Sequence, residues 1–233
     1  MISLLLHKPR LRALARRVGL TGVGYKLIPN TYGDSSKSEA KFAKALIETV
    51  HPGDCIWDVG ANVGHYTLQL AQRVGQQGCV VAFEPFDLAF RQLASATSAF
   101  SQVRCLRLAL GAHDHDLQIV PSQHGPGCTL IEQNLSGQRE TIHVTTGTKL
   151  ILDGIPTPAV LKIDVEGFEE DVVWGMREAL RNATCRNVFV EVHYGLLEQR
   201  GYLRAPSRLI SLLEDLGFRT RWLDLAHLIA GRE

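Results

Sequence analysis

The sequence predicts a single doubly wound α/β domain with a mostly parallel sheet and helices on both faces. The first observation behind this prediction is that short apolar runs alternate with segments whose apolar residues recur at helical spacing. Such alternation is typical of strand–helix–strand units joined by right-handed crossovers. The second is length, because 233 residues are enough for one well-buried domain of this class and too few for two.

The elements alternate regularly up to residue 110. The run Cys55–Val59 is apolar and bounded by glycine, as expected of a parallel strand buried on both faces. Apolar residues then recur at helical spacing over Tyr66–Val74, and Gly75 or Gly78 ends that helix. The same reasoning predicts, in order, a loop at 19–38, a helix at 40–50, the strand at 55–59, the helix from 66, a strand at 79–83, a helix at 86–100 and a strand at 103–110.

The alternation of strands and helices is interrupted between Gly111 and Thr148 and then resumes. Residues 117–120 and 141–145 alternate like the strands of a hairpin, and a polar loop joins them. A loop of that length in a compact domain is either functional or disordered. The later elements are a strand at 160–165, a helix along 168–179, a strand at 188–192, a helix at 206–216, and closing strands at 218–223 and 228–230.

Composition excludes several classes of protein. The formal net charge is +1, so no overall field draws the chain toward nucleic acid. No run approaches the roughly 18 apolar residues of a membrane-spanning helix, and we expect a cytoplasmic protein without a transmembrane segment. The cysteines lack C-x-x-C spacing, which favours reduced thiols over a disulfide framework or a zinc site; they are Cys55, Cys79, Cys105, Cys128 and Cys185.

The first 30 residues form a distinct basic segment, since six Lys and Arg residues precede the first acidic residue, Asp34. Leu4, Leu11 and Leu14 lie near one helical face. The segment is compatible with an arm that contacts a membrane surface or a partner, and also with a helix that packs its leucines on the main domain. We therefore expect a basic helical arm at residues 1–30 and the main domain at residues 31–233.

A glycine turn follows the first expected strand. Asp58, Gly60 and Gly64 give the spacing D-x-G-x-x-x-G directly before a helix. Glycines at such a turn let the backbone approach a ligand. The turn lacks the middle glycine of the dinucleotide fingerprint, which counts against a pyrophosphate compound. A methionine-type tail carries positive groups instead, and Asp58 is placed to bind them.

An acidic residue ends the second expected strand. Glu84 follows Gly64 by twenty residues, and a carboxylate there can accept both hydroxyls of a ribose lying across the strand ends. The alternative is a helix N-terminal acid favoured by the helix dipole. The combination of glycine turn and spaced acid favours the ribose role.

Three blocks resemble the FkbM-type methyltransferases, a class I family with a Rossmann-like seven-stranded sheet. They are Trp57–Thr67, Ala82–Pro85 and Leu161–Glu169, of which the third is the most specific. The resemblance implies S-adenosylmethionine as cofactor, with Gly60, Asn62 and Gly64 around its methionine part and Glu84 on its ribose. It also implies methylation of a hydroxyl on a small molecule or a sugar.

Polar residues in the next two strands are candidates for the chemistry of the acceptor. Charged groups in a buried strand are costly unless they pair or serve a function. On the functional interpretation Asp164 or His193 takes the proton of the acceptor hydroxyl, Glu191 orients its neighbour, and Lys162 holds the set together.

The same residues have a structural interpretation, in which Asp164 caps the next helix, Glu166 and Glu169 interact with its dipole, and Lys162 forms a buried salt bridge. Asp164, Glu191 and His193 could converge on a metal, but no Asp–Asn pair of the catechol-methyltransferase kind follows, and we expect no metal. The proline-rich signature of amino-methylating DNA enzymes is absent as well, so we expect a small-molecule or saccharide acceptor and no nucleic acid.

Two other functions remain open at this level. A nucleotide-linked oxidoreductase on a similar sheet is disfavoured by the missing dinucleotide fingerprint, and a module that binds S-adenosylmethionine without methyl transfer is not distinguished by the motifs. We expect the 111–148 insertion to flank the acceptor pocket. Its polar candidates for substrate contact, each also compatible with simple solvation, are His113, His115, His124 and Thr129.

Overall fold

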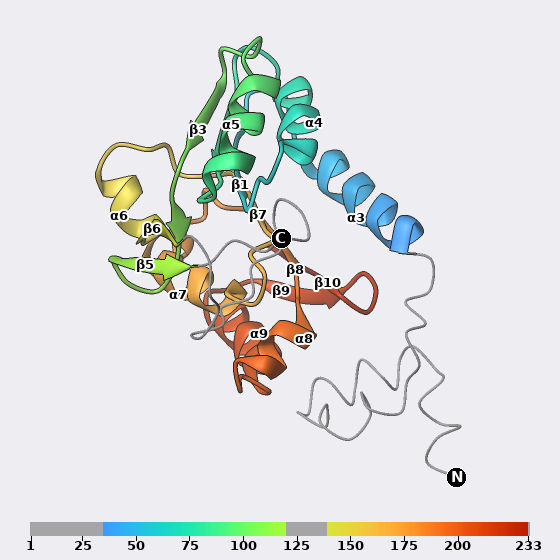
Figure 1. The fold of residues 1–233 in the computed structure, drawn as a ribbon. Helices are drawn as coiled ribbons and strands as arrows, with labels where there is room; N and C mark the ends of the chain where they lie inside the picture. Colours follow the sequence, from blue (N-terminus) through green and yellow to red (C-terminus); the bar gives the residue numbers. More distant parts are fainter. Residues whose placement is uncertain (1–34, 120–138, 233) are drawn as a thin grey trace.

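The computed structural model describes residues 35–119 and 139–232, which form an α/β fold around a seven-stranded sheet (Figure 1). The strand order is β3-β2-β1-β7-β8-β10-β9, and only β10 runs antiparallel to its neighbours. The predicted doubly wound class is confirmed. The strands are β1 (Cys55–Val59), β2 (Cys79–Phe83), β3 (Val103–Leu106), β7 (Val160–Ile163), β8 (Asn187–Glu191), β9 (Arg219–Trp222) and β10 (His227–Gly231).

Helices cover both faces of this sheet, because alternate residues of each strand point to opposite sides. The helices are α3 (Ser35–Thr49), α4 (His65–Val74), α5 (Asp87–Ala96), α6 (Gly147–Leu152), α7 (Glu169–Leu180), α8 (Tyr194–Gln199) and α9 (Ala205–Asp215). On one face α3 and α4 pack in a cluster that includes Phe42, Ile56, Leu70 and Val160. On the other face α7 and α9 pack in a larger cluster that includes Trp57, Ile163, Met176 and Leu209.

The insertion and the two residues before it form a small second sheet, with the order β4-β6-β5. Its strands are β4 (Ala109–Leu110), β5 (His115–Ile119) and β6 (Glu140–Thr145), and β5 pairs antiparallel with β6 as the alternating pattern predicts. The prediction of one strand over 103–110 is wrong. The chain leaves the main sheet after Leu106, and Ala109 pairs instead with Val144 of β6.

Two further expectations need correction. Helix α3 begins at Ser35, so the end of the predicted loop at 19–38 is helical. Cys55 and Cys79 form a disulfide rather than staying reduced, whereas Cys105 and Cys185 are free thiols. The pair forms because β1 and β2 are adjacent parallel strands whose register sets these two residues opposite each other.

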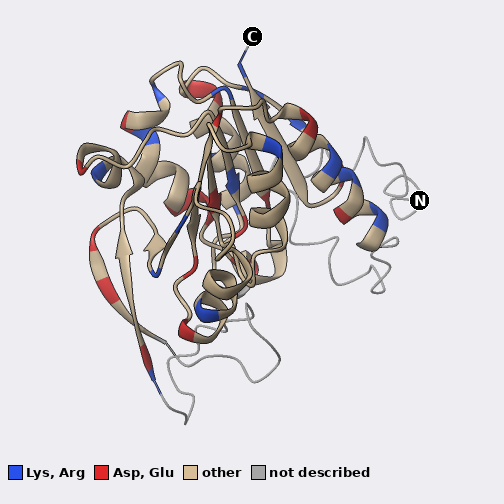
Figure 2. Cartoon of the chain, turned by 90° about the horizontal axis from the view of Figure 1, so that it is seen from above, with Lys and Arg blue, Asp and Glu red and all other residues tan. Residues whose placement is uncertain are grey.

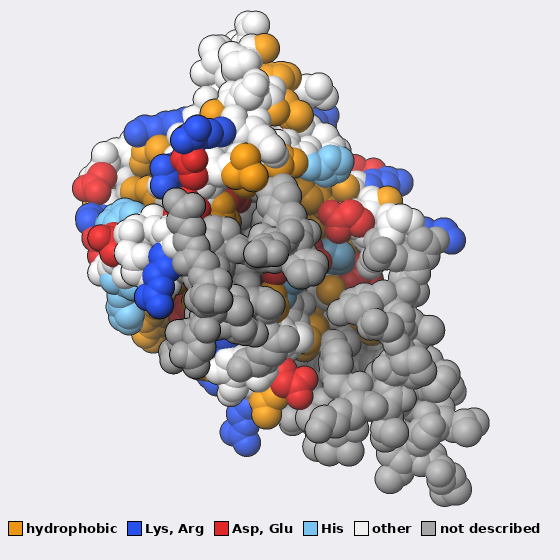
Figure 3. Space-filling model, viewed as in Figure 1, with side chains coloured by type: hydrophobic (Ala, Val, Ile, Leu, Met, Phe, Trp, Pro, Cys, Tyr) orange, Lys and Arg blue, Asp and Glu red, His pale blue; other side chains and the backbone are white. Residues whose placement is uncertain are grey.

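Other expectations fall on residues without a described structure. The basic arm at 1–30, Cys128, His124 and Thr129 lie outside the described residues. Within 35–119 and 139–232, no helix has the length and apolar character needed to cross a bilayer. Basic and acidic side chains are interspersed over the visible described surface (Figure 3), and acidic positions also lie inside the fold, among the strands (Figure 2).

Candidate active site

A cavity of about 320 Å³ lies where β1, β2 and β7 end. Open α/β sheets bind their ligands at this carboxyl edge. The strand-end residues Gly60, Glu84 and Asp164 line the cavity, and so do His113 and His115 of the insertion. The insertion therefore borders the same cavity as the glycine turn.

The glycine turn is tied to both neighbouring strands. The backbone N–H groups of Gly60 and Ala61 donate to the carbonyl of Phe83 at the end of β2. Gly60 has φ +80°, and a Cβ atom there would come within 1.8 Å of the carbonyl oxygen of Asp164. Glycine is therefore required at this position because the end of β7 approaches closely, whether or not a ligand also needs the space. Asn62 also has a positive φ, of 50°, and Gly64 precedes α4.

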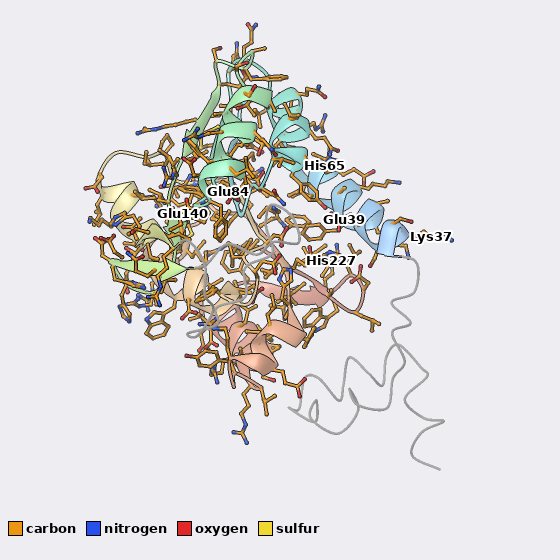
Figure 4. The ribbon with its side chains drawn as sticks, in the orientation of Figure 1. Lys37, Glu39, His65, Glu84, Glu140 and His227 are labelled. Atoms are coloured by element: carbon orange, nitrogen blue, oxygen red, sulfur yellow. A yellow bond between two sulfur atoms is a disulfide. The ribbon has the colours of Figure 1, made fainter. Side chains whose placement is uncertain are left out.

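Glu84 connects the second strand to the turn (Figure 4). Its side chain is buried in the cavity wall, where Oε2 accepts from the N–H of Asn62 at 2.9 Å and Oε1 from the N–H of Phe86 at 3.0 Å. Burial raises the pKa of Glu84 to about 7, against the lowering effect of these two bonds. Phe86 directly precedes helix α5, so Oε1 of Glu84 does bind at a helix N-terminus, as the alternative interpretation expects. Each of the two carboxylate oxygens still has a lone pair that can accept from a further donor.

Asp58 lies beneath the turn rather than in the cavity wall. It faces Lys162 across the β1–β7 register, with Oδ1 3.0 Å from Nζ, and Oδ2 accepts from the Thr67 hydroxyl at 2.7 Å. Both side chains are almost completely buried. The structure therefore places Asp58 as a support of the turn.

Lys162 joins the turn to β7. Its ammonium donates to the carbonyl of Gly60 at 2.9 Å, lies 3.4 Å from Asp164 Oδ2 and stands over the Tyr66 ring at 4.9 Å. Burial alone would lower the pKa of Lys162, but the charges of Asp58 and Asp164 raise it above its usual value. The buried salt bridge of the structural interpretation is present, and it also bridges the cofactor turn and the candidate base.

Asp164 has polar partners on two sides. Its Oδ1 lies 3.5 Å from Nε2 of His193, and its side chain, 26% exposed, lines the cavity. Burial raises the pKa of Asp164 despite the opposing charge of Lys162. The helix-cap alternative is wrong, since α7 begins after Phe168 without a side-chain cap.

His193 is held by Glu169, a residue whose position in the sequence indicates only an interaction with the helix dipole. Nδ1 of His193 lies 2.8 Å from Oε1 of Glu169, which is buried and also accepts from the N–H of Gly167. Burial alone would lower the pKa of His193, but the hydrogen bond and charge of Glu169 and the charge of Asp164 raise it to about 9. His193 is therefore protonated at neutral pH.

Glu191 lies beside this pair, with a carboxylate oxygen within 4.8 Å of ligand atoms of Asp164 and His193, and its Oε2 is 3.7 Å from Nε2 of His227. Two more charged residues line the cavity: Glu166, which the sequence offers as a helix-dipole partner, and Arg200, which no sequence motif indicates. Glu166 lines the wall with φ +56°, and Arg200 lies over the Phe168 ring at 3.6 Å. Arg200 follows the short helix α8, which the sequence pattern does not predict. Because it does not lie at the end of a strand, its position in the sequence does not mark it as a site residue.

Comparison with known proteins extends these observations. A family model for the methyltransferase FkbM domain matches residues 58–220. The chain belongs to the FkbM methyltransferase family. The chain is also 32% identical over 162 residues to the hexuronic acid methyltransferase AglP of Haloferax volcanii. That match covers 69% of this chain and 64% of the relative, so the chain spans less than two thirds of the relative's length.

Solved structures share the fold. The FkbM methyltransferase of Methylobacillus flagellatus KT has a TM-score of 0.51 at 15% identity, covering 81% of this chain and 50% of that one. Fibrillarin of Aeropyrum pernix, solved with bound S-adenosyl-L-methionine, has a TM-score of 0.53 at 15% identity, covering 83% and 73%. These likenesses confirm the class I methyltransferase fold, and membership of this family leaves the oxidoreductase alternative without support.

The cofactor of this FkbM-family chain is S-adenosylmethionine, and the cavity fits it. Glu84 offers two carboxylate oxygens with spare lone pairs, as a ribose diol requires. Apolar side chains of the wall, including Leu108, Ile142 and Val144, suit an adenine ring. The turn at 60–64 would hold the amino-acid end, and Glu84 the ribose.

Proposed function

We propose that this protein transfers the methyl group of S-adenosylmethionine to a hydroxyl of a saccharide that carries a uronic acid. The observation that supports the proposal most is the position of Asp164, a carboxylate in the cavity wall between the ammonium of Lys162 and the imidazolium of His193. A neutral hydroxyl is a poor nucleophile, and Asp164 supplies the base that it needs.

Asp164 accepts the hydroxyl proton as the new oxygen–carbon bond forms. When bound, S-adenosylmethionine would supply an electrophilic methyl group, and its positively charged sulfur would keep the electron pair of the broken sulfur–methyl bond and leave as S-adenosylhomocysteine. A positioned base contributes about 10²–10⁴-fold to such a step. Its raised pKa makes Asp164 a stronger base than an exposed aspartate. His193 is a positioning residue, because its own proton is retained at neutral pH.

Two observations support a uronic acid acceptor, namely the name of the curated relative and the position of the Arg200 guanidinium at the cavity. The relative's name specifies a hexuronic acid. In this chain Arg200 lines the cavity and lies 3.4 Å from Asp171, its carboxylate partner there. A guanidinium in that place can bind a sugar carboxylate with charge-assisted hydrogen bonds. Arg200 is therefore assigned to the uronate.

The test is methyl transfer to matched acceptors. The full chain is incubated with S-adenosylmethionine and either glucuronic or galacturonic acid glycosides or the corresponding neutral hexosides, and S-adenosylhomocysteine is measured. We expect turnover with a uronate and an alkali-stable product, because methyl ethers survive mild alkali and methyl esters do not. An alkali-labile product contradicts transfer to a hydroxyl. Turnover with neutral sugars alone contradicts the uronate assignment.

The residue assignment has its own readout. Arg200→Gln should raise KM for the uronate acceptor and leave kcat and KM for S-adenosylmethionine nearly unchanged. Equal KM values in the variant and the parent contradict a carboxylate contact at Arg200. A fall in kcat alone contradicts it too, since that result indicates damage to the cavity.

A further inference from the structure

A second polar cluster lies at the same edge of the sheet, on the face that α3 covers. Glu39 comes from α3, Glu191 from the last position of β8 and His227 from the first position of β10. The antiparallel register pairs Glu191 with His227. One carboxylate or imidazole atom of each residue lies within 4.8 Å of the other two, and Figure 4 shows Glu39 and His227 close together.

The His227 ring is fixed before any ligand arrives. Its side chain is buried, with the residue 3% exposed, and its ring stacks on Phe42 with the centroids 4.3 Å apart. Nδ1 lies 2.8 Å from Oδ2 of Asp224, which also accepts from the Ser38 hydroxyl. A carboxylate on one imidazole nitrogen sets the tautomer and presents the other nitrogen, as behind histidines that bind metals.

The presented nitrogen is buried without a hydrogen bond. Nε2 of His227 has no hydrogen-bond partner, and the facing carboxylate oxygens of Glu191 and Glu39 lie at 3.7 and 3.9 Å. These separations are too long for hydrogen bonds. They match ligands of one ion, because atoms about 2.0–2.2 Å from a shared metal lie about 3–4 Å from each other.

We propose that Glu39, Glu191 and His227 bind a divalent transition metal ion, Mn²⁺ or Zn²⁺. Imidazole combined with carboxylates suits these ions better than Ca²⁺ or Mg²⁺. The Glu39 side chain is 44% exposed, which gives the ion a path from solvent, and the Tyr66 hydroxyl donates to its Oε1 and orients it. Three protein ligands leave coordination positions open.

This site is distinct from the proposed base but adjacent to it. Atoms of Glu191, Asp164 and His193 also lie within 4.8 Å of one another, so Glu191 belongs to both groups. The ion is assigned to the Glu39 side, because Nε2 of His193 already faces Asp164 at 3.5 Å. If the proposed function holds, an acceptor oxygen is the fitting ligand for an open position. From the sequence we expect no metal, because no Asp–Asn pair follows Asp164. Glu39 and His227 are 188 residues apart and match no ligand spacing, so the sequence does not indicate this second group.

The test measures metal binding without cofactor or acceptor, so its outcome does not depend on the proposed function. The full chain is treated with a chelator, dialysed against MnCl₂ or ZnCl₂ and analysed for bound metal by mass spectrometry, with Mn²⁺ also followed by electron paramagnetic resonance. Two variants remove a ligand. Glu39→Gln keeps an acceptor for Tyr66, and His227→Asn keeps an amide donor for Asp224 but lacks Nε2. Glu48→Gln is the matched control, because this exposed carboxylate on the same helix lies 3.7 Å from the ammonium of Lys44 and is not part of the cluster.

We expect one equivalent of metal in the parent and in Glu48→Gln, and affinity at least about tenfold weaker in Glu39→Gln and His227→Asn. Absence of stoichiometric binding in the parent overturns the proposal, as does equal binding in both ligand variants. Loss of binding in Asp164→Asn with retention in Glu39→Gln places the ion elsewhere and overturns it too. Circular dichroism and affinity for S-adenosylhomocysteine identify any unfolded variant, and Glu39→Gln, at a half-exposed position, keeps the test decisive if His227→Asn does not fold.

Discussion

Replacing Glu84 by glutamine tests the cofactor site with little change in side-chain volume. The variant loses the negative charge that would attract the ribose hydroxyls. Its NH₂ group is a donor and would face one of the two backbone N–H groups that donate to the carboxylate in the parent. A hydrogen bond to a charged group contributes about 1.5–3 kcal/mol. We expect a loss of about 2–3 kcal/mol in binding free energy, which is about a 30- to 150-fold rise in Kd.

The assay is calorimetric titration with S-adenosylhomocysteine at pH 8, where Glu84 is ionised in the parent. Glu140→Gln is the control (both residues are labelled in Figure 4), because Glu140 also binds a backbone N–H, that of Asp87, and is not among the residues that line the cavity. The control should bind as the parent does. Equal affinity in Glu84→Gln and the parent would refute the ribose assignment.

The pH dependence checks the same residue by another route. The pKa of Glu84 is about 7 before the ligand binds, and the ionised form is the better acceptor. Parent affinity should therefore fall as pH decreases through 7, by about tenfold between pH 8 and pH 6. Glu84→Gln should show a flat profile over this range. A flat profile in the parent contradicts binding through the ionised carboxylate.

Three further predictions concern the acceptor side and the buried ion pair. Asp164→Asn should lower kcat by about 10²–10⁴-fold with Kd for S-adenosylhomocysteine within a few-fold, and unchanged kcat would move the base elsewhere. Glu169→Gln should lower the pKa of His193 from about 9, which NMR titration of the imidazole measures; an unshifted value would show that Glu169 does not hold the proton there. Lys162→Met should lower the free energy of unfolding, measured by urea denaturation, by about 3–5 kcal/mol, because it leaves the buried Asp58 carboxylate without its cation. Adding Asp58→Asn should recover part of that loss, and full additivity of the two changes would contradict a direct pair.

The meeting of the glycine turn and Glu84 at one sheet edge could be predicted from sequence, because both signals are local. The turn at Gly60 lies within a few residues of its strand, and Glu84 ends the next strand, so strand–helix alternation alone brings both to one sheet edge. What sequence could not give was the environment of each side chain. Asp58 was expected to meet the ligand, yet the β1–β7 register turns it toward Lys162.

The acceptor side was harder because its contacts join distant segments. His193 was recognised from its strand end, but its partner Glu169 lies on α7 and was attributed to the helix dipole. The disulfide between Cys55 and Cys79 escaped for the same reason, since only the register of adjacent strands sets the two thiols together. Residue spacing carries no signal for such pairings.

The most direct test of the account is a crystal structure of the full chain with S-adenosylhomocysteine. We expect ribose hydroxyls within hydrogen-bond distance of Glu84, the amino-acid end against the turn at 60–64, and the sulfur on the side of Asp164. A ligand bound away from the carboxyl edge of β1 and β2, or a ribose without contact to Glu84, would contradict it.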